Sequence, residues 1–236
     1  KPDLTDFQLI HEHFAVTELI TLRKQFEKYT KSKEFNTLLD EWLAEYVAHK
    51  IDGDDYFVQQ TPNVRVVIPN QEKFGRLLPF HSGYWTGYDN HTYTCWVPLT
   101  KAWDSNTMHV MSWEKSIETV KTIYDNQSSY EEMERLCCEN SWPVNLEYGQ
   151  VWMFNQGHLH GNINNETGFS RVSFDVRVIS AKSEFEFRKP GSYYRLPGDS
   201  AEDNFNRLNT EGRWLVFTDP CSNFTYPAPH YMVREF

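Results

Sequence analysis

Apolar side chains recur every three or four positions over the first fifty residues. The positions that carry this pattern are Leu19, Ile20, Leu22 and Phe26, then Phe35, Leu38, Leu39, Trp42, Leu43, Tyr46 and Val47. Such spacing gathers apolar side chains on one face of a helix. We therefore expect residues 1–55 to form a helical N-terminal support.

The pattern changes to short β-branched and aromatic runs after residue 62. The expected strands are 63–68, 92–99, 107–113, 144–148, 150–154 and 170–179, each close to Pro, Asn or Gly turn residues. Residues 116–140 have a helical pattern, with Glu131, Glu132 and Glu134 on a face expected to meet only solvent. This predicts a β core over residues 63–180 with a helical insertion at 116–140.

Beyond residue 182 the chain contains Pro, Gly and aromatic residues without a clear period, and we expect this tail, 182–236, to wrap the core. We find no internal repeat and no flexible linker. The prediction is one domain over residues 1–236. Its fold class is α+β, mainly β: a double-stranded β-helix of the jelly-roll, cupin-like kind, with the N-terminal helices packed on it.

Composition narrows the functional classes. The formal net charge of −10 argues against a nucleic-acid partner, because phosphate binding needs clustered Lys and Arg. No apolar run reaches the roughly 18 residues of a membrane span, and no secretory signal opens the chain. Four cysteines without metal-pair or disulfide spacing suggest free thiols. We expect a cytoplasmic protein that does not bind membranes.

The most informative chemistry lies in two histidine-bearing segments about eighty residues apart. His81 follows Leu78-Pro79-Phe80, and His160 follows a predicted strand and loop. Arg171 lies eleven residues beyond His160, and Ser173 shares its strand face because side chains alternate. Two imidazoles suit a non-haem iron, and a guanidinium beside a hydroxyl suits a carboxylate. The alternative is that Arg171 pairs with a nearby acid and His160 fills a polar loop.

The usual third ligand of such an iron site is a carboxylate two residues after the first histidine. That position is Gly83 here, and glycine cannot bind a metal. No nucleophile elbow, P-loop or dinucleotide-binding glycine motif is present, so acyl transfer, nucleotide hydrolysis and hydride transfer have no support.

The sequence from Val64 to Ile179 resembles the StrG-like branch of the phytanoyl-CoA hydroxylase superfamily. The matching segments are Leu78–His81, Cys95–Thr100, Tyr148–Gln150, His160–Asn162 and Arg171–Arg177. This family implies a double-stranded β-helix that uses Fe(II) and 2-oxoglutarate. The resemblance makes His81 and His160 iron ligands. It also implies that Arg171 and Ser173 bind the distal carboxylate of 2-oxoglutarate and that Thr94 makes a minor contact with the same co-substrate.

The resemblance departs from the family pattern at Gly83. Among relatives, His-x-Gly is the pattern of halogenases, in which chloride takes the place of the carboxylate. Hydroxylation stays an equal alternative, with Asp89, His91, His158 or water as the third ligand. A catalytically silent small-ligand-binding barrel, such as a partner subunit, is the other alternative.

The reaction implied by the resemblance is oxidation of an unactivated C–H bond by oxygen and 2-oxoglutarate. The expected substrate is a small polar metabolite like a sugar or an amino acid, free or carrier-linked. Tyr84, Trp85 and Tyr88 follow the first histidine and either line the substrate pocket or pack at the rim of the barrel. Arg65 either meets an anionic substrate group or forms an ion pair.

Overall fold

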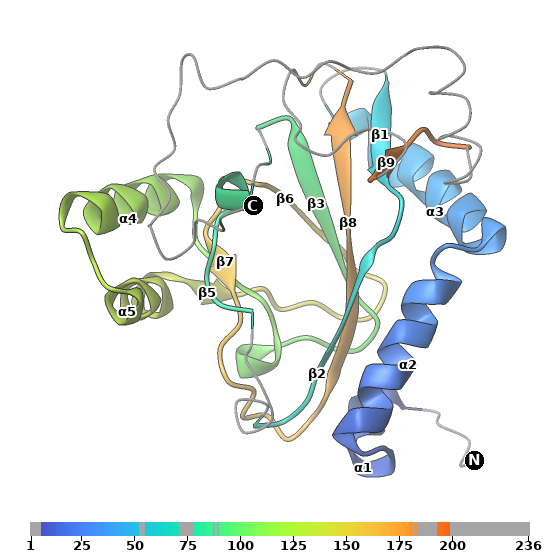
Figure 1. Cartoon of the computed structure of the whole chain (residues 1–236), viewed down its shortest axis with the longest axis horizontal. Coiled ribbons are helices and arrows are strands. Elements are labelled where there is room, and N and C mark those ends of the chain that lie inside the picture. The colour runs from blue at the N-terminus through green and yellow to red at the C-terminus, as the bar shows by residue number, and fades with distance from the viewer. Residues whose placement is uncertain are drawn as a thin grey trace.

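The computed structural model describes residues 6–51, 55–70, 78–86, 88, 90–181, 183 and 193–198. The fold combines helices with antiparallel sheets (Figure 1). The helices are α1 (Ile10–His13), α2 (Val16–Tyr29), α3 (Lys33–Tyr46), α4 (Trp113–Asp125) and α5 (Tyr130–Asn140). The strands are β1 (Tyr56–Gln59), β2 (Asn63–Val67), β3 (Thr92–Pro98), β4 (His109–Val110), β5 (Trp142–Pro143), β6 (Trp152–Asn155), β7 (His160–Gly161), β8 (Arg171–Ser180) and β9 (Tyr194–Arg195).

The main sheet is built around β8. Its strand order is β6-β3-β8-β1-β9, and β2 pairs with the first half of β8 on the side where β1 pairs with the second half. All these pairs are antiparallel. Because side chains alternate along a strand, β8 presents its odd and even residues to opposite faces of the sheet.

The apolar face of the main sheet is covered by the N-terminal helices. Leu43 of α3 is fully buried and belongs to one cluster with Val58, Cys95, Val176 and Val178. A second cluster packs α1 and α2 against the same face through Ile10, Leu19, Ile68 and Val172. The apolar positions of the first fifty residues therefore include the side chains that cover this face, as expected for amphipathic helices, but Ile20, Leu38 and Tyr46 of the same pattern are exposed.

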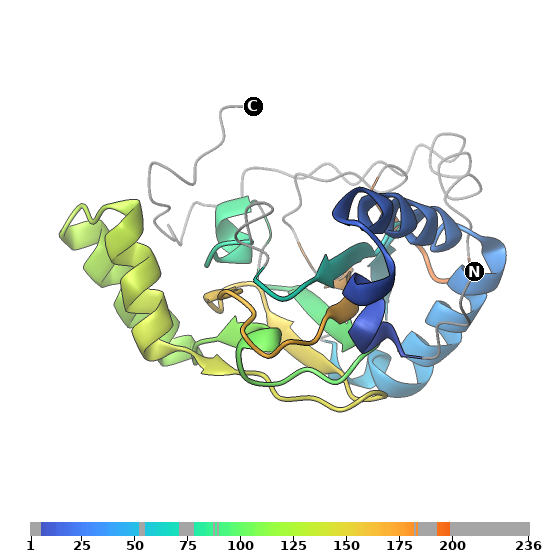
Figure 2. The ribbon, with the colours of Figure 1, turned by 90° about the horizontal axis from the view of Figure 1, so that it is seen from below.

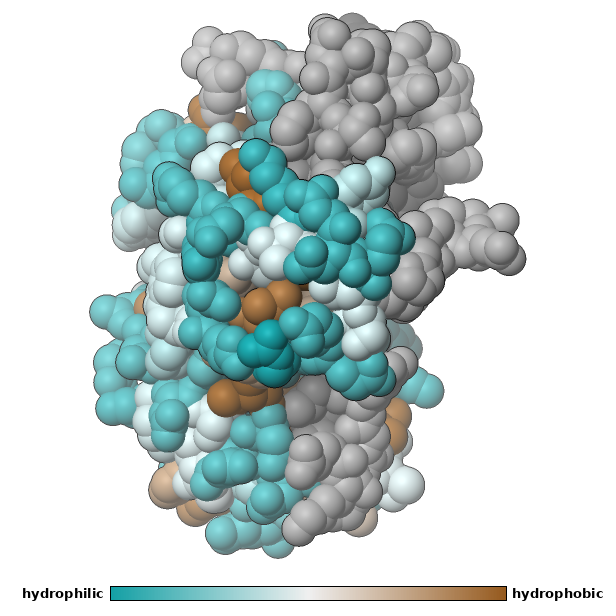
Figure 3. All heavy atoms as spheres, turned by 90° about the vertical axis from the view of Figure 1, so that its left-hand side faces the viewer, coloured by the Kyte–Doolittle hydropathy of each residue, from teal (hydrophilic) through white to brown (hydrophobic). Residues whose placement is uncertain are grey.

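A smaller sheet, of order β5-β4-β7, packs against the other face of the main sheet. The two sheets meet in a cluster formed by Trp96, Ala102, Met108, Val110, Val144 and Phe154. Helices α4 and α5 close the far end through an apolar cluster that includes Met111 and Leu159. Figure 2 shows α2 and α3 at one end of the molecule and α4 and α5 at the other. Figure 3 shows that the surface on the α4–α5 side is mainly hydrophilic.

Several predicted elements are confirmed and others are not. The strands predicted at 63–68, 92–99 and 170–179 and the helical insertion are present, and the insertion begins at Trp113 as two helices. The strand predicted at 144–148 is wrong: Leu146 makes only an isolated bridge to Ala102. β1 was not predicted, and most of the tail 182–236 lies outside the described residues. None of the helices in the described ranges is long and apolar enough to cross a bilayer.

Candidate functional site

The two predicted ligand histidines lie next to each other. The backbone N–H of His81 donates to the backbone carbonyl of His160 at 2.9 Å, and the backbone N–H of His160 donates to the backbone carbonyl of His81 at 3.0 Å. The imidazole centroids are 4.3 Å apart. Residues directly opposite in an antiparallel pair project their side chains to the same side. This backbone pairing therefore holds the two imidazole rings side by side.

Backbone carbonyls fix the tautomer of both rings. The Nδ1 of His81 lies 3.0 Å from the carbonyl oxygen of Pro79, and the Nδ1 of His160 lies 2.8 Å from that of His158. A carbonyl can only accept, so each Nδ1 carries the proton and each Nε2 keeps its lone pair. Burial lowers the pKa of His81 to about 4, and burial together with His81 lowers the pKa of His160 well below its usual range. Both rings are therefore neutral at pH 7, the form that binds a metal.

The segment that carries His81 is positioned by its neighbours. Glu134 of α5 accepts a hydrogen bond from the N–H of Phe80 at 3.0 Å. The expectation that Glu134 meets only solvent is therefore wrong. A Cβ on Gly161 would lie 2.7 Å from backbone atoms of Phe80, so glycine is what allows β7 to approach this closely.

The rings open onto a cavity between the two sheets. Its lining residues are Arg65, Leu78, His81, Thr94, Trp96, Met108, Phe154, His160, Gly161, Asn162, Arg171, Asp175 and Arg177. Arg171, Asp175 and Arg177 come from odd positions of β8, the face away from the N-terminal helices. The sheet therefore separates an apolar core on one side from a charged cavity on the other.

Arg171 is a buried cation without a counter-ion among the described residues. Its side chain is 1% exposed, and its Nη2 donates to the Oδ1 of Asn162 at 2.8 Å. The Arg171 Nε and the Oγ of the fully buried Ser173 have no hydrogen-bond partner within the described part of the chain. Burial, and then the charge of Arg65, lower the pKa of Arg171 to about 9, so it stays charged at pH 7. Unpaired donors beside a buried cation form a site for an anion.

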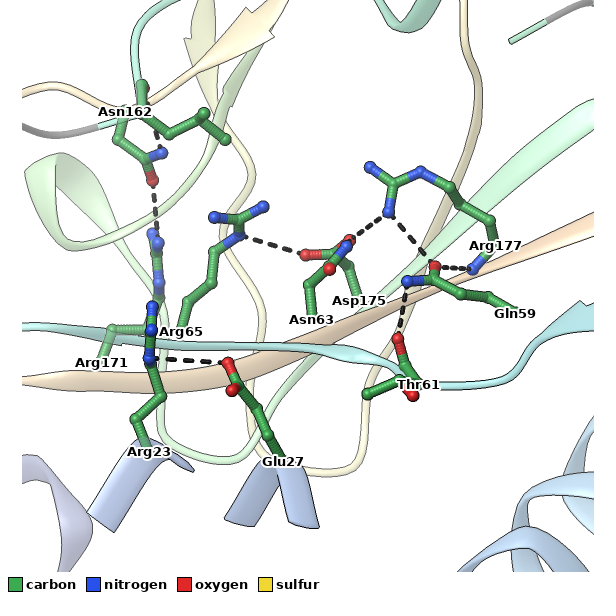
Figure 4. A network of polar contacts seen from close by, with 11 residues as sticks. Arg23, Glu27, Gln59, Thr61, Asn63, Arg65, Asn162, Arg171, Asp175 and Arg177 are labelled. Carbon is green, nitrogen blue, oxygen red and sulfur yellow. Dashed lines mark hydrogen bonds and ion pairs between the residues drawn. The ribbon is translucent and has the colours of Figure 1, made fainter. Parts of the chain in front are cut away.

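Asp175 balances the other two guanidinium groups of the cavity (Figure 4). Its carboxylate accepts from Arg65 Nε at 3.1 Å, from Arg177 Nη1 at 2.9 Å and from Asn63 Nδ2 at 2.8 Å. Burial raises the pKa of Asp175, but Arg65 and Arg177 hold it below its usual value. Arg65 is therefore paired, as in one of the two predicted alternatives. Nothing in the sequence analysis singled out a role for Asp175, although its alternation with Arg171 and Arg177 on one strand was a usable signal.

Gly83 is buried and faces Gln156. A Cβ built on Gly83 would overlap the Gln156 Oε1 atom and lie 2.8 Å from the Gln156 Cβ. The Gln156 side chain is 1% exposed, and its Nε2 donates to Thr94 Oγ1 at 2.6 Å. The volume that an aspartate at residue 83 would fill is thus taken by Gln156 and is not left open. Sequence reasoning missed Gln156.

No protein-family model matches the chain. The chain is 26% identical to the streptomycin biosynthesis protein StrG of Streptomyces griseus over 192 residues, which cover 79% of this chain and 80% of StrG. The chain is similar to StrG. The predicted likeness to StrG-like proteins is confirmed by this match.

Solved structures give weaker matches. A non-heme monooxygenase, ThoJ in complex with nickel, matches 76% of this chain and 70% of its own, with 17% identity and a TM-score of 0.49. AviO1 from Streptomyces viridochromogenes Tue57 matches 64% of this chain and 63% of its own, with 16% identity and a TM-score of 0.46.

Two of the other third-ligand candidates that the resemblance left open, His158 and His91, are not among the described residues that line the cavity. His158 directs its Nδ1 to the carbonyl of Met111 at 2.9 Å. His91 lies in the turn before β3, where its carbonyl accepts from the N–H of Ser180. Asp89 lies outside the described residues. Within the described ranges, no three His, Cys, Asp or Glu side chains gather as a metal site.

Proposed function

We propose that this chain is a non-haem Fe(II)- and 2-oxoglutarate-dependent enzyme, with a double-stranded β-helix core, that oxidises an unactivated C–H bond of a small polar metabolite. The observation that carries this proposal is the pair of neutral imidazoles, His81 and His160, beside the uncompensated Arg171. Two free Nε2 lone pairs at one point suit a divalent metal. A buried guanidinium in the same cavity suits an acid that is bound with that metal.

Each residue then has a defined task. His81 and His160 would hold the iron, and their backbone-bound Nδ1 atoms keep the rings oriented. Arg171 and Ser173 would bind the distal carboxylate of 2-oxoglutarate through the Nε and Oγ atoms that have no partner among the described residues. Thr94 lines the cavity and would make a minor contact. Bound iron supplies the activation of oxygen, which the protein itself cannot provide.

The geometry beside Gly83 favours oxygen insertion over halogenation. The halogenase interpretation requires the volume of the missing aspartate to be free for chloride, and Gln156 fills that volume. Mass spectrometry of turnover products in chloride and bromide buffers decides between the two. We expect products that gain oxygen only; a product that gains halogen would support the halogenase interpretation instead.

The substrate class follows from the cavity and from StrG. Among the described residues, the cavity is lined by the charged side chains of Arg65, Arg171, Asp175 and Arg177 from the main sheet and by the amide of Asn162, which follows β7. StrG is described as a streptomycin biosynthesis protein. A sugar- or amino-acid-like metabolite of a biosynthetic route, free or carrier-linked, is the substrate that this likeness supports.

The test is anaerobic addition of Fe(II) and 2-oxoglutarate, followed by visible absorption. We expect a metal-to-ligand charge-transfer band from wild type and none from His160→Ala. His13→Ala serves as the matched control, because His13 lies exposed on α1 and should leave the band unchanged. Absence of the band in wild type under saturating iron would refute the proposal and favour a catalytically silent binding protein.

A further inference from the structure

Arg65 and Arg177 share a single carboxylate in the cavity. The Nε of Arg65 donates to one oxygen of Asp175 at 3.1 Å, and the Nη1 of Arg177 donates to the other oxygen at 2.9 Å. Asp175 is 4% exposed, and no second carboxylate lines the cavity among the described residues. Asp175 can therefore offset only one of the two positive charges, so the arginine pair keeps one charge that no described residue compensates.

Both guanidinium groups keep hydrogen-bond donors without a partner. The Nε of Arg177 is buried and makes no hydrogen bond within the described part of the chain. Arg65 contacts the described residues through its Nε alone, so both of its Nη groups remain available there. Figure 4 shows the two guanidinium groups on either side of Asp175. Buried donors need an acceptor, and the planar fork of arginine suits the oxygens of a phosphate or a carboxylate.

The Arg177 guanidinium is held in place by its neighbours. Its Nη1 also donates to the Oε1 of Gln59 at 3.3 Å, and its Cζ lies 4.7 Å from the ring centroid of Tyr88. Together with Asp175 these contacts fix the group before any ligand arrives. A cation that is already oriented loses little conformational entropy when an anion binds to it.

Arg177 lies apart from the position proposed for the distal carboxylate of 2-oxoglutarate. Arg171 and Arg177 are six residues apart on β8, which a strand rise of about 3.3 Å per residue converts to roughly 20 Å between their Cα atoms. The arginine pair acts instead on the imidazoles: burial, followed by the charges of Arg65 and Arg177, lowers the pKa of His81. A ligand anchored by this pair would therefore lie close to the histidines, where the proposed function places the reaction.

We propose that Arg65 and Arg177 bind the acidic group of the substrate, a phosphate ester or a carboxylate, and that Asp175 positions the two guanidinium groups for it. This inference rests on the proposed function, which makes the ligand of this cavity a substrate, and it narrows the small polar metabolite to an acidic one. Binding of the anion itself requires neither iron nor 2-oxoglutarate.

The test is calorimetric titration of the metal-free protein with inorganic phosphate and, separately, with acetate at constant ionic strength. Tighter binding of phosphate would support a phosphate ester, and tighter binding of acetate would support a carboxylate. Arg65→Gln and Arg177→Gln should each weaken binding of the preferred anion by about tenfold or more, because each removes a charged partner of that anion. Arg23→Gln is the matched control, since the Arg23 side chain is 44% exposed on α2 and pairs with Glu27. It should bind within about twofold of wild type.

Two further variants locate the anion. Arg177→Lys keeps the charge beside Asp175 but loses the planar fork, so it should weaken binding less than Arg177→Gln does and still be measurable if Arg177→Gln unfolds. Arg171→Gln should weaken binding less than either glutamine variant of the pair. The inference is overturned if wild type binds neither anion, if Arg65→Gln and Arg177→Gln bind as wild type does, or if Arg171→Gln alone abolishes binding. None of these results affects the charge-transfer band; absence of that band with anion binding intact would refute the proposed function instead.

Discussion

Replacing Asp175 with asparagine tests whether its carboxylate stabilises the folded protein by neutralising the arginines that line the cavity. The substitution keeps the shape and removes the charge that faces Arg65 and Arg177. The Arg177 side chain is 11% exposed and the Arg65 side chain 32% exposed, so the first cation is largely cut off from water and the second only partly. Asparagine can still accept from one of them but cannot neutralise either.

The expected loss of stability follows from this burial. Removing one partner of a buried ion pair costs about 3–5 kcal/mol, because the remaining charge is left uncompensated. Arg177 falls in this class, whereas the partial exposure of Arg65 reduces its share. We therefore expect Asp175→Asn to lower the free energy of unfolding by about 3 kcal/mol.

The assay is urea unfolding followed by tryptophan fluorescence, which the 8 tryptophans of the chain make sensitive. Glu147→Gln is the control, because it removes an equally short pair, Lys101–Glu147 at 2.7 Å, whose side chains are 50% and 63% exposed. Exposed pairs contribute less than about 1 kcal/mol. If Asp175→Asn costs no more than Glu147→Gln, the carboxylate does not compensate the two guanidinium groups and the reasoning is wrong.

The ion pairs of Asp175 also predict how the free energy of unfolding depends on pH. The pKa of Asp175 is lower in the folded protein than its ordinary value of 3.8. Between the folded pKa and that ordinary value, Asp175 is protonated in the unfolded chain but not in the folded chain. The free energy of unfolding therefore decreases as the pH is lowered through this range. The difference between wild type and Asp175→Asn should be full at pH 6 and should shrink as the pH drops through the folded pKa. A constant difference across this range would contradict the ion-pair account.

Three further predictions follow from single contacts. Arg171→Gln should weaken 2-oxoglutarate binding by about thirtyfold, roughly 2 kcal/mol, and should not lower the free energy of unfolding, because it removes an uncompensated buried cation. Titration of the charge-transfer band measures the affinity and urea unfolding measures the stability; an unchanged affinity would contradict the role assigned to Arg171. Gly83→Ala should destabilise by about 1–3 kcal/mol through overlap with Gln156, and a neutral effect in urea unfolding would argue against that packing. Leu43→Ala should cost about 2–5 kcal/mol by the same measurement, whereas Leu38→Ala, at a 58% exposed position of the same helix, should change it by less than about 0.5 kcal/mol.

The parts of the fold that sequence could predict are those with enough residues to show a period. The helices that cover the main sheet and the strands β2, β3 and β8 each carry several apolar side chains on one face. The two-residue strands β4, β5, β7 and β9 are too short for any alternation to be visible. They exist because neighbouring strands offer hydrogen-bond partners, which is tertiary information.

The same distinction applies to the site. His81, His160 and Arg171 were predictable because their residue types and spacing match a known chemistry. Gln156 was not, because it lies in the loop before His158, and a glutamine there gives no signal by itself. Its importance arises only when the fold brings it against Gly83, about seventy residues earlier in the sequence.

The charge of the cavity links these observations. Among the described residues, three guanidinium groups and one carboxylate line the cavity and both imidazoles are neutral, so these residues give it a local excess of two positive charges within a chain of net charge −10. The dianionic acid that the proposed function places at Arg171 would offset that excess. A divalent metal held by His81 and His160, as the proposed function requires, would add two more positive charges that no aspartate at residue 83 would reduce. In a site shielded from water such charge draws anions strongly. If the site holds the metal and 2-oxoglutarate of the proposed function, the glycine at residue 83 would leave charge neutralisation to the group that binds last, and we would expect a substrate with an acidic group to bind better than a cationic one.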